Sequence, residues 1–66
     1  MTQRQEDIQA LKDIIIPGVE YRAVTLSRQA VIPIDRTSEA LSALCNLDYL
    51  MFGIDDVAGY HVYRTI

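Results

Sequence analysis

The sequence predicts a small α+β domain with the element order α-β-β-α-β-β, in which two hairpins form one antiparallel sheet and both helices cover one face of it. Three observations support this prediction. Apolar residues recur at helical spacing in two stretches, runs of β-forming residues follow each stretch, and turn-forming residues separate the runs. With 66 residues, half of them hydrophobic, the chain is expected to form a single domain over residues 1–66.

The first predicted helix covers residues 3–15. Thr2 can act as its N-cap, and Gln5 stands three residues later, as a capping box requires. Apolar side chains then recur at helical spacing, at Ile8, Leu11 and Ile15. The dipeptide Pro17-Gly18 is expected to end this helix.

Two strands are predicted next, at residues 19–26 and 30–34, because both runs are rich in β-forming residues. They would form a hairpin, although the connecting residues include no Gly or Asn to favour a tight turn. With Leu26 opposite Ala30, one face collects the apolar side chains of Val24, Leu26, Ile32 and Ile34. Pro33 cannot donate a ladder hydrogen bond, so the second strand would be an edge strand.

The second predicted helix covers residues 38–46. Residues 35–38 include several N-cap candidates, and Glu39 suits the first turn of a helix. The apolar stripe of this helix consists of Ala40, Leu41, Leu44 and Cys45. Asn46 is a candidate C-cap.

Residues 47–52 allow two interpretations. A helix could run on to Phe52 and end at Gly53, but it would be apolar nearly all round and would carry Asp48 inside its apolar stripe. A strand is favoured because residues 49–54 are followed by a turn-like segment and a second β-forming run, residues 60–66.

The last hairpin has a predicted register in which Ile54 faces Tyr60 across a loop of residues 55–59. Alternation along the strands then assigns two faces. The core face holds Leu50, Phe52, Ile54, Tyr60, Val62 and Ile66, and the other face holds Tyr49, Met51, Gly53, His61, Tyr63 and Thr65. A change of one residue in the loop length would exchange the buried and exposed sides.

Six residues of this hairpin are candidate partner-binding residues. Tyr and Met side chains are favoured at interfaces, so Tyr49, Met51 and Tyr63 are predicted to form a contact surface with His61 at one end. The remaining two, at the predicted hairpin tip, are Asp55 and Asp56, whose carboxylates would attract a basic partner. The competing interpretation is an ordinary sheet face that is solvated or covered by a helix.

The sequence offers little support for catalysis or for cofactor binding. Cys45 and His61 are the only thiol and the only imidazole, and Cys45 lies on the apolar stripe of a predicted helix, where an inert thiol is the usual case. Asp55 and Asp56 with His61 match no metal-ligand spacing. We therefore predict a protein that is not an enzyme and holds no cofactor and no metal.

The net charge of −3 and the pI near 4.7 argue against direct binding to nucleic-acid phosphates, which needs clustered Lys and Arg. No apolar run approaches the roughly 20 residues that a membrane-spanning helix needs. A single cysteine fits a reducing compartment. We expect a cytoplasmic protein that contacts neither membrane nor nucleic acid directly.

The function hypothesis is a small acidic inhibitor or regulator that occupies a basic, nucleic-acid-binding surface of a partner protein. By analogy of size and charge, it would be a nucleic-acid mimic like the anti-restriction and anti-CRISPR proteins of phages and mobile elements, acting in the host cytoplasm. The alternative is a homo-oligomeric structural or accessory subunit, for example a homodimer, that associates through the Tyr49, Met51 and Tyr63 face. The acidic surface could also serve solubility alone.

Overall fold

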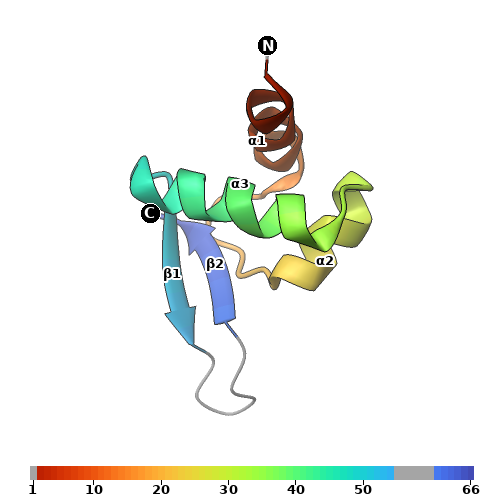
Figure 1. Ribbon diagram of the computed structural model, residues 1–66. Helices are drawn as coiled ribbons and strands as arrows, with labels where there is room; N and C mark the ends of the chain where they lie inside the picture. Colours follow the sequence, from red (N-terminus) through yellow and green to blue (C-terminus); the bar gives the residue numbers. More distant parts are fainter. Residues whose placement is uncertain (1, 55–60) are drawn as a thin grey trace.

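A computed structural model describes residues 2–54 and 61–66 of the chain. The described residues form three helices followed by a two-stranded antiparallel sheet (Figure 1). The elements are α1 (Gln3–Ile14), α2 (Ala23–Ala30), α3 (Ile34–Asn46), β1 (Leu50–Ile54) and β2 (His61–Thr65). The fold is therefore a small mixed α+β fold, as predicted, but its order is α-α-α-β-β.

Helix α1 begins as the sequence predicts. The Thr2 hydroxyl accepts a hydrogen bond from the Gln5 backbone N–H at 3.2 Å, and the Gln5 side chain accepts one from the Thr2 N–H at 2.9 Å. This is the expected capping box, which satisfies two N–H groups that the helix cannot pair internally. The helix ends at Ile14, and Ile15 is its C-cap.

The first predicted hairpin is wrong, because Ala23–Ala30, in the middle of its residues 19–34, form α2. Ala23, Leu26 and Ala30 recur at helical spacing and turn toward the core, where Leu26 has no exposed surface. Burial of this face outweighs the β-propensity of the neighbouring residues, which is a weak preference that depends on context. What remains of the predicted strand is an isolated bridge between Tyr21 and Tyr63 of β2.

The turn between α2 and α3 explains why α3 begins before residue 38. Val31 adopts a left-handed conformation with φ 56°, which reverses the chain after α2. Pro33 is the N-cap of α3 rather than an edge-strand residue, and its carbonyl accepts the Thr37 N–H at 2.9 Å. Ser27 donates from its hydroxyl to the Ile32 carbonyl at 2.6 Å, which ties the turn back to α2.

Helix α3 ends at Asn46, and Leu47 rather than Asn46 is its C-cap. A helix that runs on to Phe52 is therefore excluded, and residues 50–54 form a strand, as favoured from the sequence. Asp48 turns the chain between the two elements with φ 59°. Asp is one of the few residue types other than Gly that adopt this conformation readily.

The predicted register of the last hairpin is wrong by one residue. Ile54 pairs with His61, Phe52 with Tyr63, and Leu50 with Thr65. Six residues, 55–60, lie between the paired strand ends instead of the five that the prediction assumed. A shift of one residue on one strand exchanges the neighbours of every side chain across the sheet, so the predicted faces do not hold.

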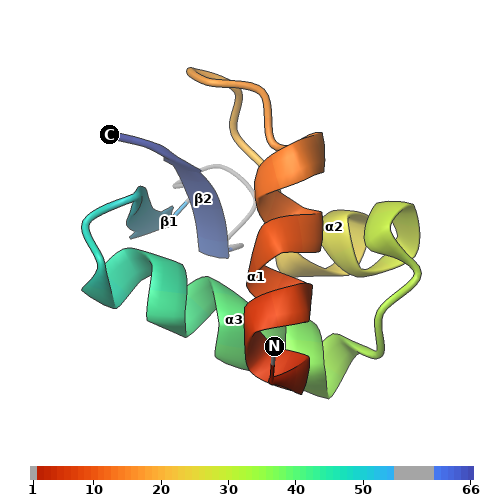
Figure 2. The ribbon, with the colours of Figure 1, turned by 90° about the horizontal axis from the view of Figure 1, so that it is seen from above.

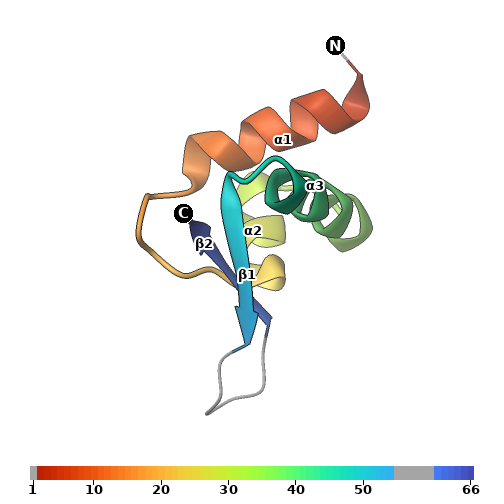
Figure 3. The same ribbon diagram turned by 90° about the vertical axis from the view of Figure 1, so that its left-hand side faces the viewer.

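The core lies where the three helices meet the start of β1. Its buried apolar side chains are Leu11, Ile15, Leu26, Ala40, Leu41, Leu44 and Leu50. Helix α1 crosses α3 when the molecule is seen from above (Figure 2). Helix α3 packs against β1 and α2 packs against β2, both on one side of the hairpin (Figure 3). The prediction that the first helix also covers the sheet is not confirmed.

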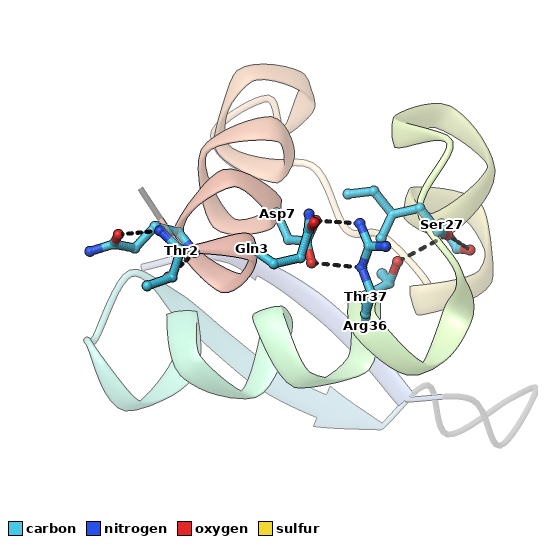
Figure 4. Close-up of polar contacts among 8 residues, drawn as sticks. Thr2, Gln3, Asp7, Ser27, Arg36 and Thr37 are labelled. Atoms are coloured by element: carbon cyan, nitrogen blue, oxygen red, sulfur yellow. Dashed lines mark hydrogen bonds and ion pairs between the residues drawn. The ribbon is translucent and has the colours of Figure 1, made fainter.

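An ion pair joins α1 to α3 beside this core (Figure 4). The Arg36 guanidinium donates two hydrogen bonds to the Asp7 carboxylate, at 3.0 and 2.9 Å, and Gln3 donates a third at 3.1 Å. Asp7 is only 4% exposed. The hydrogen bonds from Arg36 outweigh the effect of burial and lower the pKa of Asp7 from its ordinary value of 3.8.

Within the described residues, no helix is both long enough and apolar enough to cross a membrane.

Val31→Gly is expected to raise the free energy of unfolding by about 1 kcal/mol, because a β-branched residue is strained in the left-handed region and Gly is not. The Val31 side chain is 89% exposed, so its removal sacrifices little packing. Urea denaturation measures the change. Val31→Ala is the control, since it keeps a Cβ and should gain much less. A Gly variant less stable than the wild type would contradict the role assigned to this turn.

Asp7→Asn should lower stability at neutral pH, and the difference from the wild type should shrink as the pH falls. The lowered pKa means that the Asp7 carboxylate stabilises the fold fully above the ordinary value of 3.8. That stabilisation is lost as the pH falls below 3.8 and through the folded-state pKa. Thermal unfolding at pH 7 and at pH 3 tests this, with the exposed Asp13→Asn as control. A difference that does not vary with pH would contradict the ion-pair account.

Candidate partner-binding surfaces

One side of the hairpin carries a shallow hollow of about 220 Å³. In the observed register Met51 pairs with Arg64 and Gly53 with Val62, so these four residues share one side of the sheet. Leu50 is buried among the helices, so this is the side that faces away from the core. The lining residues of the hollow are Glu20, Met51, Phe52, Gly53, Ile54, Val62 and Arg64.

The hollow is lined by more polar than apolar surface, and its lining residues include charges of both signs. Gly53 has no side chain to fill the hollow. A Cβ added there would lie 3.7 Å from the nearest Val62 methyl carbon, which is ordinary van der Waals contact. Met51 is 44% exposed beside it. Glu20 and Arg64 supply one charge of each sign. Among the described lining residues Glu20 is the only carboxylate, and they include no Ser, Thr, Cys or His side chain to complete a nucleophile–base pair with it.

The predicted surface of Tyr49, Met51 and Tyr63 does not exist as one face. Met51 lies on the outer side of the sheet, whereas Tyr63 pairs with Phe52 on the core side, where it is half-buried. Tyr49 precedes β1, packs against the core and has the Lys12 ammonium 4.9 Å from its ring centroid. Whether each residue contacts a partner stays a prediction, but the shared face that motivated it is wrong.

The other candidate residues have separate positions. His61 is exposed at the start of β2, and its ring meets the Phe52 ring edge-on with centroids 4.7 Å apart. Tyr63 meets Phe52 in the same manner at 5.6 Å. Asp55 and Asp56 lie outside the described residues.

Phe52 and Ile54 are the surface residues that the sequence prediction missed. Both were assigned to the core face, yet they are 51% and 58% exposed. The hairpin extends past the helices, so among the described strand residues Leu50 alone is fully buried and Tyr63 is only partly buried against the core. An uncharged apolar run such as Leu50–Ile54 ordinarily predicts a buried strand, so no local signal in the sequence indicated this exposure.

Helices α2 and α3 are joined by a three-residue turn, Val31 to Pro33, a length that helix-turn-helix motifs also use. The exposed polar residues of α3 recur at helical spacing: Asp35, Ser38, Glu39, Ser42 and Asn46. Arg36 is held by Asp7. Glu39 is paired at 3.6 Å with Arg4 of α1, an exposed contact that contributes little stability.

Cys45 and His61 form no catalytic pair in the described part of the chain, where no contact joins them. Cys45 is half-buried rather than fully buried, and burial raises the pKa of its thiol. Burial, and then the neighbouring Cys45, raise the pKa of Tyr63. Residues 2–54 and 61–66 contain no group of three or more side chains that could hold a metal ion.

Comparison with protein-family models, with curated proteins and with solved structures finds no match for this chain. Its function therefore has to be argued from the surfaces themselves.

Cys45 should react with a thiol reagent on the order of tenfold more slowly in the native protein than in the unfolded chain at pH 7, because the reactive thiolate is disfavoured by burial. Cys45→Ala should cost about 1 kcal/mol of stability through lost packing and leave partner binding unchanged. The labelling rate is measured by the absorbance of the chromophore that the thiol reagent releases. The stability of the variant is measured by chemical denaturation. Equal rates in the native and unfolded states would show that the thiol is open to solvent.

Proposed function

We propose that this protein binds another protein and acts without catalysis, as an inhibitor or regulator that occupies a basic, nucleic-acid-binding surface of its partner. The observation that carries the proposal is the exposed face of α3, which presents Asp35 beside serine hydroxyls, while Arg36 and Arg4 are each ion-paired with a carboxylate. An exposed carboxylate such as that of Asp35 can take the place of a phosphate on a basic surface. The net charge of −3 agrees with such a role.

The ion pairs of α3 support a basic partner over a nucleic acid. Phosphate binding needs Lys and Arg side chains that reach outward. On α3 the only cation is Arg36, and Asp7 occupies two of its N–H groups. Arg4 of α1 is paired with the Glu39 carboxylate at 3.6 Å.

The rival is direct DNA binding, and the turn between α2 and α3, which has a length that helix-turn-helix motifs also use, favours it. In DNA-binding proteins of that kind the second helix lies in the major groove, with its N-terminal residues against the base edges. Helix α3 would be that helix, and Ser38 and Ser42 would be able to hydrogen-bond to bases. A fold does not establish a function, so the charge of the site decides our preference.

Asp35→Asn should weaken capture of a partner by about threefold or more, and raised salt should weaken capture by the wild type, because both reduce attraction between exposed charges. Immobilised wild type and variants, incubated with extract of the source cell and compared by quantitative mass spectrometry, measure this. Asp48→Asn is the matched control, since it removes one exposed carboxylate away from α3 and Asn tolerates the same backbone conformation. A double Asp55→Asn, Asp56→Asn variant extends the test to the acidic pair between the strands.

A mobility-shift assay with duplex DNA separates the two candidate functions. We expect no wild-type complex at micromolar protein and physiological salt. A complex that Ser38→Ala or Ser42→Ala weakens would favour the rival. The basic-surface proposal would be contradicted if Asp35→Asn and the wild type captured the same partner equally well and if salt did not change the amount captured.

A further inference from the structure

Strand β1 is an edge strand with one side unpaired among the described residues. The sheet has two strands, and β1 pairs with β2 alone. The far side of β2 is occupied instead, because Tyr63 exchanges two backbone hydrogen bonds of 2.8 Å with Tyr21. Any further strand must therefore join the sheet at β1.

The hydrogen bonds of Tyr63 identify the backbone groups that β1 leaves free. Its N–H and C=O point toward Tyr21, away from β1. Because these groups alternate along an antiparallel strand, Val62 and Arg64 point toward β1 and bond to Gly53 and Met51. The N–H and C=O groups of Phe52, between these two residues, and of Ile54, after Gly53, therefore point to the free edge.

The side chains of β1 offer this edge no protection. Natural edge strands carry Lys, Pro, a bulge or an inward-pointing charge that blocks further pairing. The strand Leu50–Ile54 has none of these, and its ladder with β2 is regular. Phe52 and Ile54, 51% and 58% exposed, lie on the same side of the strand. An added strand would bury part of both.

We propose that β1 pairs antiparallel with β1 of a second copy of this chain, so that two hairpins form one four-stranded sheet about a two-fold axis at Gly53. Phe52 would exchange two backbone hydrogen bonds with Ile54 of the partner subunit, and the symmetric pair would supply two more. Gly53 would face Gly53 of the partner subunit on the axis, where the absence of side chains permits a close approach.

A second copy fits this edge because the edge is complementary to itself. Both strands are uncharged, so no like charges meet across the axis. Each offers two donors and two acceptors at the same spacing, which a two-fold axis aligns, as in isologous dimers. The same operation sets the Phe52 side chain beside Ile54 of the partner subunit, on the same side of the joined sheet. This surface is separate from the α3 face of the proposed function.

The expected affinity is modest. One short strand and a few half-exposed side chains bury less than the roughly 800 Å² per partner of a standard interface. A dissociation constant on the order of tens to hundreds of micromolar is therefore expected.

Amide hydrogen exchange, followed by NMR on the intact protein over a concentration series, tests the geometry directly. The Phe52 and Ile54 amides should become protected as concentration rises from about 20 μM to about 1 mM, by roughly tenfold near the upper end. The Met51 and Gly53 amides, already bonded to β2, should change little. Protection that is equal along β1, or that appears on α3 instead, would overturn the proposal.

Ile54→Lys tests the same proposal by sedimentation equilibrium, because a charge on the edge opposes strand pairing. The wild type should show a monomer–dimer equilibrium, and this variant should weaken it tenfold or more. Ile16→Lys is the matched control, because Ile16 is 60% exposed, about as much as Ile54, but lies outside the sheet. The Ile16→Lys variant should dimerise as the wild type does. Circular dichroism verifies that both variants are folded. A wild type that stays monomeric at about 1 mM, or equal loss in both variants, would refute the proposal.

Discussion

Leucine side chains from all three helices meet in the core of this protein with no exposed surface: Leu11, Leu26, Leu41 and Leu44. The rest of the structure depends on their burial. A domain of this size has little apolar surface to bury, so each helix must turn its apolar stripe to the common centre. This requirement makes residues 23–30 helical, and among the described strand residues it buries only Leu50 fully, with Tyr63 partly buried beside it.

The outward surfaces follow from the same constraint. Because the helices hold only the base of the hairpin, Phe52 and Ile54 project beyond them, and Met51 faces away. Because α1 and α3 cross beside the core, Asp7 meets Arg36, which removes that cation from the outer face of α3. The surface that remains is apolar on the hairpin and polar to acidic on α3. Both kinds of surface suit contacts with protein better than contacts with phosphate.

The sequence predicted the parts of the fold that local chemistry decides. The capping box of Thr2 and Gln5, the end of α3 at Asn46 and the strand after it all follow from neighbouring residues. Helix α2 could not be predicted in this way, since its β-branched residues favour a strand and only contact with distant leucines overrides them. The register depended on one residue of loop length, which neither strand specifies. The candidate site failed with it: Met51 faces outward as expected, but Tyr63 does not.

The register of the hairpin is the central claim, because both the outer hollow and the free edge depend on it. Nuclear Overhauser contacts between Hα protons measure it directly, since residues paired without mutual hydrogen bonds bring their Cα atoms to about 4.5 Å. The structure predicts a strong Hα–Hα contact between Phe52 and Tyr63, and another between Ile54 and His61. Contacts that join Phe52 to Val62 would contradict the account, and would return Tyr63 to the same face as Met51.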